Sequence, residues 1–380
     1  MFTGLKYLVV GSGLYGAVMA ERLASQLGER VLVIDKRPNP GGNCHSSFDP
    51  ETGIEIHTYG SHIFHTSQEK VWDYINCFTS FTPYRHFVQT VYRGQVYPMP
   101  ISLATINSFF RSAMGPDEAQ RFIENEIATL SIDNPVNLEE KAISLIGPSL
   151  YHAFIKGYTA KQWEKSPREL PSDIITRLPV RFNYNTNYFN DPWQGLPVDG
   201  YSAMFEKLLA HSNIEVRTGI DFKDIRSQVP SDCTVIYTGM IDEYFDNCFG
   251  TLDWRSLRFD VERVETGDYQ GCPVMNYADE DVPWTRIHEF KHYNPERVSA
   301  FNASSSIICR EYSQTYCPGM EAYYPINNDR NQAIYSQYAR KASQCSNLVL
   351  GGRLGCYRYW DMDKTIFYAL EQFEQCFLNR

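Results

Sequence analysis

Three glycines near the N-terminus constrain the fold of this chain more than any other feature. Gly11, Gly13 and Gly16 follow a short apolar run and precede apolar residues at helical spacing. A second apolar run, residues 31–34, ends in Asp35. This order is typical of a βαβ unit that binds a dinucleotide, in which the glycines let the backbone approach a pyrophosphate and the acid accepts a ribose hydroxyl. The segment therefore predicts a Rossmann-like α/β domain.

A second glycine pair indicates which dinucleotide is bound. Gly41 and Gly42 come just after the second predicted strand and precede Asn43. Glycines at such a point let the backbone pass close to a ligand. NAD-dependent enzymes do not usually need them there, whereas many flavoproteins do, so we predict FAD.

The rest of the chain predicts two further regions. Amphipathic stretches between residues 103 and 158 indicate inserted helices, and alternating polar and apolar residues at 181–184 and 255–325 indicate a mainly antiparallel sheet. A hairpin is expected at 87–97, isolated buried strands near 214, 234 and 347, and a closing helix from about Thr365. We predict an FAD domain from 1–66, 200–250 and 335–380, a helical domain at 67–176, and a sheet domain from 177–199 and 251–334.

Composition excludes several classes of protein. With 35 Lys and Arg against 45 Asp and Glu, the net charge of −10 argues against nucleic-acid binding. The ten cysteines form no CxxC pair and no spacing typical of zinc, so we expect free thiols and no metal site. No apolar run is long enough for a signal peptide or a membrane helix, which favours a cytoplasmic protein that does not bind membranes.

Three groups of residues have both a structural and a functional interpretation. A lone histidine such as His62 is more often a core residue than a catalyst. The aromatic residues between 154 and 163 either fill a core or line a cleft in which a planar base stacks. Several arginines beside apolar or aromatic residues, among them Arg177, Arg286 and Arg353, suit a diphosphate, because guanidinium offers paired donors to phosphate oxygens.

A series of motifs in order resembles the bacterial UDP-galactopyranose mutase family of flavin-dependent nucleotide-sugar mutases. The likeness runs from about residue 5 to about residue 370. The motifs include the glycine motif, Tyr59-Gly-Ser-His-Ile-Phe-His65, Gly157-Tyr-Thr-Ala-Lys-Gln-Trp163, Arg177-Leu-Pro-Val-Arg181, Thr285-Arg-Ile-His288 and Gly351-Gly-Arg-Leu354. The segments at 157–163 and 177–181 are far more specific than the glycine motif.

The resemblance implies interconversion of UDP-galactopyranose and UDP-galactofuranose without net oxidation. In the family, N5 of reduced FAD attacks the anomeric carbon, UDP leaves, and the flavin–sugar adduct opens and closes to the other ring size. An external reductant of the flavin, a homodimer and a role in cell-surface polysaccharide biosynthesis are further expectations of the resemblance.

The resemblance also assigns roles to residues. Arg177, Arg286 and His62 match catalytic positions, and the charged segment at about 161–177 matches a mobile substrate loop. The cofactor positions are Gly11, Gly13, Leu14, Tyr15, Gly16, Asp35, Lys36, Gly42, Asn43, His62, Ile63, Arg353, Asp361, Met362, Asp363 and Thr365. The substrate positions are His86, Phe154, Tyr158, Thr159, Trp163, Arg177, Tyr188, Asn276, Arg286, Tyr324, Arg353 and Tyr359.

Departures from the family pattern leave the substrate open. His86 and Phe87 occupy variable positions near the sugar, and Cys356 and Trp360 differ from the usual residues. Mutases of UDP-N-acetylgalactosamine or of dTDP-fucose share most of these motifs and are the main alternative. A flavin oxidoreductase on the same fold would not need the paired arginines, and a nucleotide-sugar-binding protein without catalysis would not need His62. The uridine pocket matches fully, so we favour UDP-galactose.

Overall fold

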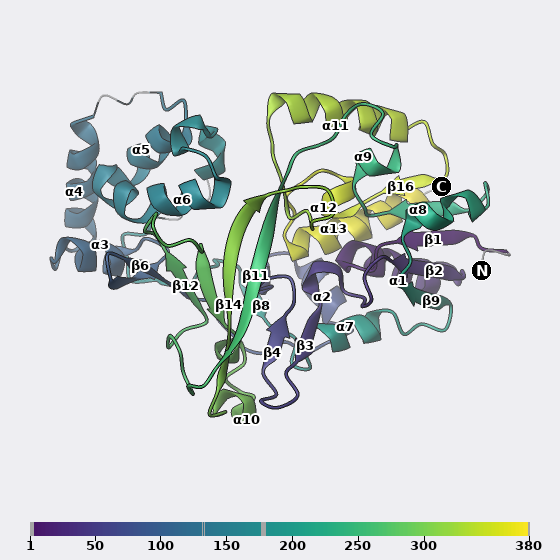
Figure 1. The fold of residues 1–380 in the computed structure, drawn as a ribbon, viewed down its shortest axis with the longest axis horizontal. Helices are drawn as coiled ribbons and strands as arrows, with labels where there is room; N and C mark the ends of the chain where they lie inside the picture. The colour runs from purple at the N-terminus through teal and green to yellow at the C-terminus, as the bar shows by residue number, and fades with distance from the viewer. Residues whose placement is uncertain (1–3, 131, 133, 176–179, 379–380) are drawn as a thin grey trace.

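The computed structural model describes residues 4–130, 132, 134–175 and 180–378. Its elements form three regions: one built on a parallel sheet, a large central sheet, and a lobe of helices (Figure 1). The predicted α/β class, with inserted helices and a mainly antiparallel second sheet, is confirmed. Within the described ranges, no helix is long and apolar enough to cross a lipid bilayer.

A five-stranded parallel sheet carries the glycine motif. Strands from the beginning, middle and end of the chain lie side by side in the order β16-β10-β1-β2-β9 (Figure 1). The runs predicted as isolated strands therefore belong to one sheet, two of them side by side and the third at the opposite edge. The strands are β1 (Tyr7–Val10), β2 (Val31–Asp35), β9 (Ile214–Thr218), β10 (Thr234–Tyr237) and β16 (Leu348–Leu350).

Alternation along β1 explains how this sheet is buried on both faces. Tyr7 and Val9 point into the core shared with α1 (Leu14–Leu27), whereas Leu8 and Val10 point into a second core with α8 (Phe222–Ile225). The closing helix α13 (Met362–Phe373) packs against α1 and begins three residues before the predicted start. The helices α2 (Glu69–Asn76), α7 (Tyr201–Leu208), α9 (Ile241–Tyr244), α11 (Asp329–Ala342) and α12 (Gly352–Gly355) complete this side of the molecule.

The central sheet has seven strands in the order β15-β11-β14-β13-β12-β6-β7. All neighbours are antiparallel except β12 and β6. The predicted hairpin is confirmed as β6 and β7, and it joins this sheet although it lies within the range predicted as the helical domain. The strands are β6 (Val88–Tyr92), β7 (Gln95–Met99), β11 (Trp254–Val264), β12 (Val274–Tyr277), β13 (Arg286–Glu289), β14 (Ser306–Thr315) and β15 (Tyr324–Pro325).

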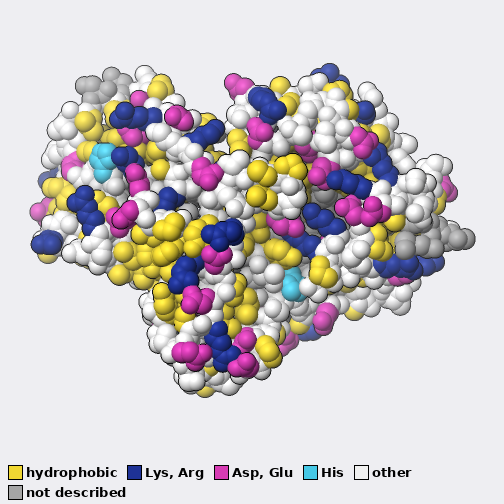
Figure 2. Space-filling view, viewed as in Figure 1, with side chains coloured by type: hydrophobic (Ala, Val, Ile, Leu, Met, Phe, Trp, Pro, Cys, Tyr) yellow, Lys and Arg dark blue, Asp and Glu magenta, His cyan; other side chains and the backbone are white. Residues whose placement is uncertain are grey.

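The helical lobe lies beyond the β6–β7 edge of this sheet (Figure 1). It contains α3 (Leu103–Phe110), α4 (Pro116–Ala128), α5 (Leu138–Leu150) and α6 (Lys156–Trp163), which share one apolar core. Asn137 caps α5 by accepting a hydrogen bond from the Glu140 amide, so α5 starts at a defined residue. In the space-filling view a notch separates this lobe from the parallel-sheet region (Figure 2).

The strand predicted at 181–184 is wrong. Arg181 forms only an isolated bridge with Ser102, and the following residues form bends. The buried Arg181 guanidinium donates to the carbonyl oxygens of Asn185 and Asn187 and to Asn190 Oδ1, at 2.7 Å for the last. The arginine thus holds the asparagine-rich segment that follows in a loop, while the main chain of 181–183 bonds residues 101 and 103 at a single bridge.

Two short strand pairs bring residues 45–66 between the parallel sheet and the central sheet. β3 (Ser46–Phe48) pairs with β4 (Glu55–His57), and β5 (Phe64–Thr66) pairs with β8 (Trp193–Gly195). The His57 ring stacks on Tyr293 of the central region at 5.4 Å between ring centroids. The short helix α10 (Val298–Phe301) follows this contact. The predicted functional segment 58–65 therefore lies at the junction of two regions.

Candidate active site

The N-terminus of α1 forms the first part of the predicted cofactor site. Gly13 is the N-cap of this helix and makes no side-chain cap hydrogen bond, so within the described residues the first amides of α1 have no capping side chain. Glycine is required around it: a Cβ on Gly11 would lie 2.0 Å from Thr238 Oγ1, and one on Gly16 would lie 1.9 Å from the carbonyl oxygen of Gly11. Leu14 and Tyr15 are buried just behind this turn.

Asp35 ends β2 beside the glycine turn, as predicted. Its carboxylate accepts hydrogen bonds from the Ser12 amide at 2.8 Å, the Ser12 hydroxyl at 2.6 Å and the Arg37 amide at 2.9 Å. The acid therefore ties the glycine turn to the end of the strand. Lys36, the next residue, is exposed and lies 4.0 Å from Glu321.

The second glycine pair packs directly against the first motif. A Cβ on Gly42, whose φ is +56°, would lie 2.9 Å from the Cα of Gly13. Asn43 accepts a hydrogen bond from the Arg37 guanidinium at 2.9 Å, and that guanidinium lies 3.9 Å from the centre of the Tyr59 ring. The two glycine motifs form one cradle in which backbone approaches backbone, and such a cradle fits a dinucleotide.

The C-terminal segment closes the other side of this cradle. A Cβ on Gly351 would overlap the Tyr15 ring. Arg353 donates to the carbonyl oxygens of Tyr323 at 3.1 Å and Trp360 at 2.6 Å, so its guanidinium is held in place. Asp361 caps α13, with Met362 as its first residue; the Thr365 hydroxyl donates back to the Asp361 carbonyl, and Asp363 accepts from Thr66 at 3.4 Å.

His62 is held as a neutral base between these parts. Its Nδ1 lies 2.7 Å from the Gly60 carbonyl oxygen, which can only accept, so the hydrogen belongs on Nδ1 and the lone pair on Nε2. Burial, helped by the nearby His57 and Arg353, lowers the pKa of His62 to about 3. Ile63, also predicted at the cofactor, is buried beside it.

One row of the central sheet collects the predicted diphosphate residues. Asn276, Arg286 and Glu311 are direct partners across β12, β13 and β14, so their side chains share one face. Arg286 donates to the Tyr158 hydroxyl, and its Nε lies 3.4 Å from Glu311 Oε1. Asn276 Oδ1 and Arg286 Nε are buried and have no hydrogen-bond partner among the described residues. Asn276 Oδ1 is therefore available to a polar ligand, whereas Arg286 Nε faces the Glu311 carboxylate as an ion pair.

Neighbouring charges keep both Arg286 and Glu311 ionised. Burial alone would lower the pKa of Arg286, but Glu311 and Tyr158 hold it well above its usual value. Burial would raise the pKa of Glu311, but Arg286 and His288 outweigh it and lower that pKa to about 2. Arg286 is therefore a fixed cation, already partly balanced by an anion.

Tyrosines surround this arginine. Tyr324 and Tyr359 stack at 5.3 Å between ring centroids, and Arg353 lies over both rings at 5.7 and 5.0 Å. Burial raises the pKa of Tyr324 well above 10, against the opposing charges of Arg353 and Arg286. Tyr188 is 41% exposed and contacts His86 at 5.3 Å between ring centroids. The predicted cofactor arginine and substrate arginine are thus brought into one site.

The helical lobe contributes less directly than predicted. Phe154 is only 3% exposed, and its ring packs against Tyr92, Tyr97 and Phe109 in the core of the lobe. Of the two interpretations of Phe154, a core residue or a residue that lines a cleft, the structure therefore supports the core residue. Thr159 is buried, Trp163 packs on the edge of the same core, and only Tyr158 reaches Arg286. Arg177 lies outside the described residues.

Sequence reasoning missed the partners that hold these side chains. Glu311 and His288 were not singled out, although alternation placed both on predicted strands. Lys161 was assigned no role, although it lies in the 157–163 motif and begins the charged segment. Its ammonium donates to the carbonyl oxygens of Tyr277, Asp279, Val282 and Trp284, at 2.7–3.1 Å. Hydropathy alternation shows which face a residue occupies but not which strand lies opposite, so no signal identified these partners.

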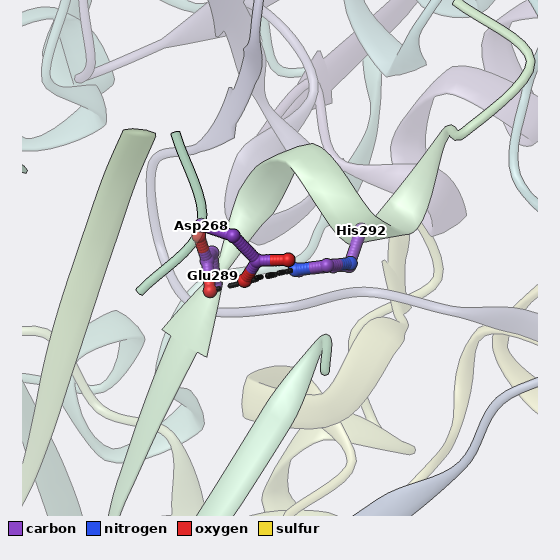
Figure 3. Close-up of side chains that lie close together, drawn as sticks. All are labelled: Asp268, Glu289 and His292. Atoms are coloured by element: carbon purple, nitrogen blue, oxygen red, sulfur yellow. Dashed lines mark hydrogen bonds and ion pairs between the residues drawn. The ribbon is translucent and has the colours of Figure 1, made fainter. Parts of the chain in front are cut away.

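A second cluster of ionisable groups lies on the central sheet away from the arginines. Figure 3 shows Asp268, Glu289 and His292 pointing toward one another. His292 Nε2 lies 3.1 Å from Asp268 and 3.5 Å from Glu289. Glu289 also accepts from two backbone amides and from Ser306, and against the effect of burial these bonds lower its pKa to about 2. We interpret the cluster as an ion-pair network that closes the 265–272 loop.

Comparison with known proteins agrees with the geometry. A family model described as UDP-galactopyranose mutase matches residues 153–359, and one described as an NAD(P)-binding Rossmann-like domain matches residues 9–78. A probable UDP-galactopyranose mutase of Klebsiella pneumoniae is 42% identical over 96% of this chain and 92% of its own length. A dTDP-fucopyranose mutase of Escherichia coli is 40% identical over 96% of this chain and 97% of its own.

The solved structures share the fold. A crystal structure of reduced UDP-galactopyranose mutase superposes with a TM-score of 0.73 over 98% of this chain and 95% of its own, at 15% identity. A putrescine oxidase with bound putrescine superposes with a TM-score of 0.58 over 99% of both chains, at 10% identity. At these identities the superpositions report the fold alone.

Proposed function

The chain belongs to the UDP-galactopyranose mutase family, and from that premise we propose that it interconverts UDP-galactopyranose and UDP-galactofuranose with FAD in the reduced form. One observation carries the proposal: the cation Arg286 and the buried Asn276 Oδ1, which no described residue hydrogen-bonds, lie on one sheet face beside Tyr158 and the stacked Tyr324 and Tyr359. Such a set suits a diphosphate joined to a sugar.

The described residues fit FAD. The two glycine motifs leave room only for backbone, the uncapped amides of α1 suit a pyrophosphate, and Asp35 suits a ribose. Arg353, Asp361, Met362, Asp363 and Thr365 lie at the opposite wall of the cradle. When bound and reduced, FAD supplies the nucleophile for the ring contraction.

The side chains of the protein then bind and balance charge. Arg286 holds the diphosphate and stabilises the negative charge that grows on UDP as it leaves the sugar, which keeps the nucleotide in place for its return. Arg177, which lies outside the described residues, is proposed to bind the same diphosphate as part of a substrate loop at about 161–177. His62, neutral and with a free lone pair on Nε2, accepts a hydrogen bond at the flavin or at a sugar hydroxyl.

Two relatives with different named substrates bear on which nucleotide sugar this protein converts. The chain is about equally identical to a UDP-galactopyranose mutase and to a dTDP-fucopyranose mutase. His86, buried beside Tyr84 at 2.9 Å, is proposed to contact the sugar, and Tyr188 with Trp163 the base. We favour the uridine nucleotide because the residues at the uridine-side positions of the family, among them Tyr158, Trp163 and Tyr188, are all present. A dTDP-fucose or UDP-N-acetylgalactosamine substrate is the alternative.

We also propose where the reaction takes place, which partners it needs and what its product serves. The protein is expected to act in the cytoplasm as a homodimer, to receive electrons for its flavin from an external reductant, and to supply furanose precursors of cell-surface polysaccharide. The roles proposed for the site residues do not depend on these four points.

Nucleotide binding tests the substrate choice without turnover. Displacement of a fluorescent UDP probe by UDP, dTDP and UMP should rank UDP first and UMP last, because the second phosphate is the partner of Arg286. Stronger displacement by dTDP than by UDP would move the proposal to the dTDP-fucose alternative, and equal displacement by UMP would contradict diphosphate binding.

A further inference from the structure

A buried chain of one ion pair followed by hydrogen bonds runs from the proposed diphosphate site to the predicted flavin site through His288. Arg286 and Glu311 are direct partners on β13 and β14, and His288 lies two residues beyond Arg286. Alternation along a strand places Arg286 and His288 on the same face. His288 Nε2 lies 3.1 Å from Glu311 Oε2, and Arg286 Nε lies 3.4 Å from Glu311 Oε1. The histidine and the arginine therefore hold opposite oxygens of one carboxylate.

The other nitrogen of His288 faces two hydroxyls. Its Nδ1 lies 2.8 Å from Ser61 Oγ and 3.0 Å from the Tyr293 hydroxyl, and these two hydroxyls lie 2.6 Å apart. Ser61 directly precedes His62. The chain of contacts thus begins at Arg286 and ends next to the predicted flavin residue.

The hydrogen positions in this chain are fixed by chemistry. An ionised Glu311 can only accept, so His288 Nε2 carries the hydrogen, and in the neutral ring Nδ1 must accept from a hydroxyl. His288 is 1% exposed, and burial lowers its pKa despite the opposing effect of Glu311. The lowered pKa keeps the ring neutral near pH 7. A neutral donor orients Glu311 without cancelling its charge.

We propose that His288 is a positioning residue for diphosphate binding: its Nε2–H holds Glu311, and Glu311 in turn fixes the guanidinium of Arg286. This inference rests on the proposed function, because it assumes that Arg286 binds the diphosphate of a nucleotide sugar. Without His288, Glu311 would keep its charge but lose one of its two strongest partners. It would then rotate toward Arg286 and compete with the diphosphate for the guanidinium.

The test measures the dissociation constant of UDP in the FAD-loaded protein. His288→Leu should weaken UDP binding about tenfold, which is the effect of losing one hydrogen bond to a charged group. His288→Gln places an amide donor where Nε2 lies and should stay within about threefold of the native protein. His288→Asn is too short to reach Glu311 and should behave like His288→Leu. The control is His211→Leu, an exposed histidine before β9.

Coupling to Glu311 separates positioning from packing. Glu311→Gln should itself weaken UDP binding, and adding His288→Leu to it should cause little further loss, because the carboxylate that His288 holds is then absent. Independent, multiplying effects would overturn the inference. So would equal UDP affinity of His288→Leu and the native protein. Where His288→Leu does not fold, the comparison of His288→Gln with His288→Asn decides in the same way.

Turnover distinguishes this inference from the proposed function. If the native protein binds UDP but converts no nucleotide sugar, the mutase function fails while the binding series still decides the role of His288. If the native protein converts the sugar and the His288 variants bind UDP like the native protein, only the inference fails. If the native protein does not bind UDP, both fail.

Discussion

At the scale of single residues, the charge of Arg286 is the central element of the site. Its Nε is buried, and it is paired with Glu311 on one side and Tyr158 on the other. The ion pair leaves a cation whose remaining donors can face a diphosphate. Burial makes these interactions strong, because few waters compete for them.

Replacing Arg286 should remove catalysis and spare the cofactor. Arg286→Ala should lower kcat at least a hundredfold, the usual cost of losing a donor to developing charge. The flavin absorbance should be unchanged, because Arg286 does not belong to the glycine cradle. Arg310→Ala is the matched control: Arg310 is next to Glu311 on β14 but on the opposite face, paired with Glu262. Arg177→Ala should behave like Arg286→Ala. Full activity of either variant would contradict its proposed role.

The sequence predicted charged and aromatic residues of the site but not what fixes them. Arg286, Tyr158 and Asn276 were found because they match family motifs. Glu311 and His288 depend on which strand lies opposite β13, and a strand register is set by contacts between distant segments. Phe154 was ambiguous for a related reason: an aromatic cluster looks the same in sequence whether it lines a cleft or fills a core.

At the scale of elements, local order was easier to predict than pairing. The β1–α1–β2 unit follows from apolar periodicity and the glycine turn, both of which lie within 30 residues. The parallel pairing of β6 with β12 joins segments almost 190 residues apart, and no local pattern indicates it. Residues 181–184 were mistaken for a strand because alternation of side chains does not show how far the main chain pairs, and here the pairing is a single bridge to Ser102.

Lys161 joins α6 to the loop between β12 and β13, and removing it should loosen that junction. Four backbone carbonyls surround its ammonium, so Lys161→Met leaves buried acceptors without a donor. We expect the free energy of unfolding to fall by about 3 kcal/mol. UDP binding should also weaken, because the same helix carries Tyr158. Urea unfolding compares this variant with Lys165→Met, an exposed lysine of the same segment. Equal stability of the two variants would contradict a stabilising role of the Lys161 ammonium and its four carbonyl partners.

At the scale of the whole molecule, the site exists only where three regions meet. Arg353 lies on α12 in the parallel-sheet region, Arg286 on β13 of the central sheet and Tyr158 on α6 of the helical lobe. Histidines from the same junction are buried and neutral: burial, with nearby positive groups, lowers the pKa values of His57, His62 and His86 to about 3.

These histidines should make the protein without FAD sensitive to acid. Between pH 6.5 and 3 the unfolded chain binds protons at these three side chains and the folded protein does not, so stability falls as the pH falls. Each histidine contributes about 1.4 kcal/mol per pH unit over that range. Urea unfolding at pH 6.0 and 5.0 should show the loss, and His62→Gln should reduce the slope by about one proton, whereas His211→Gln should not. A stability that does not change between these pH values would contradict the neutral, buried state.

The most direct test of the proposed mutase activity is turnover of a furanose substrate by the purified, FAD-loaded protein. UDP-galactofuranose is incubated with and without dithionite, and UDP-galactopyranose is measured by chromatography, with dTDP-fucofuranose and UDP-N-acetylgalactosamine run in parallel. We predict conversion of UDP-galactofuranose with reduced flavin and none with oxidised flavin. Conversion of dTDP-fucofuranose alone would change the substrate and keep the reaction. Conversion that is equally fast with oxidised flavin, or no conversion of any of the three by a fully loaded protein, would contradict the central claim.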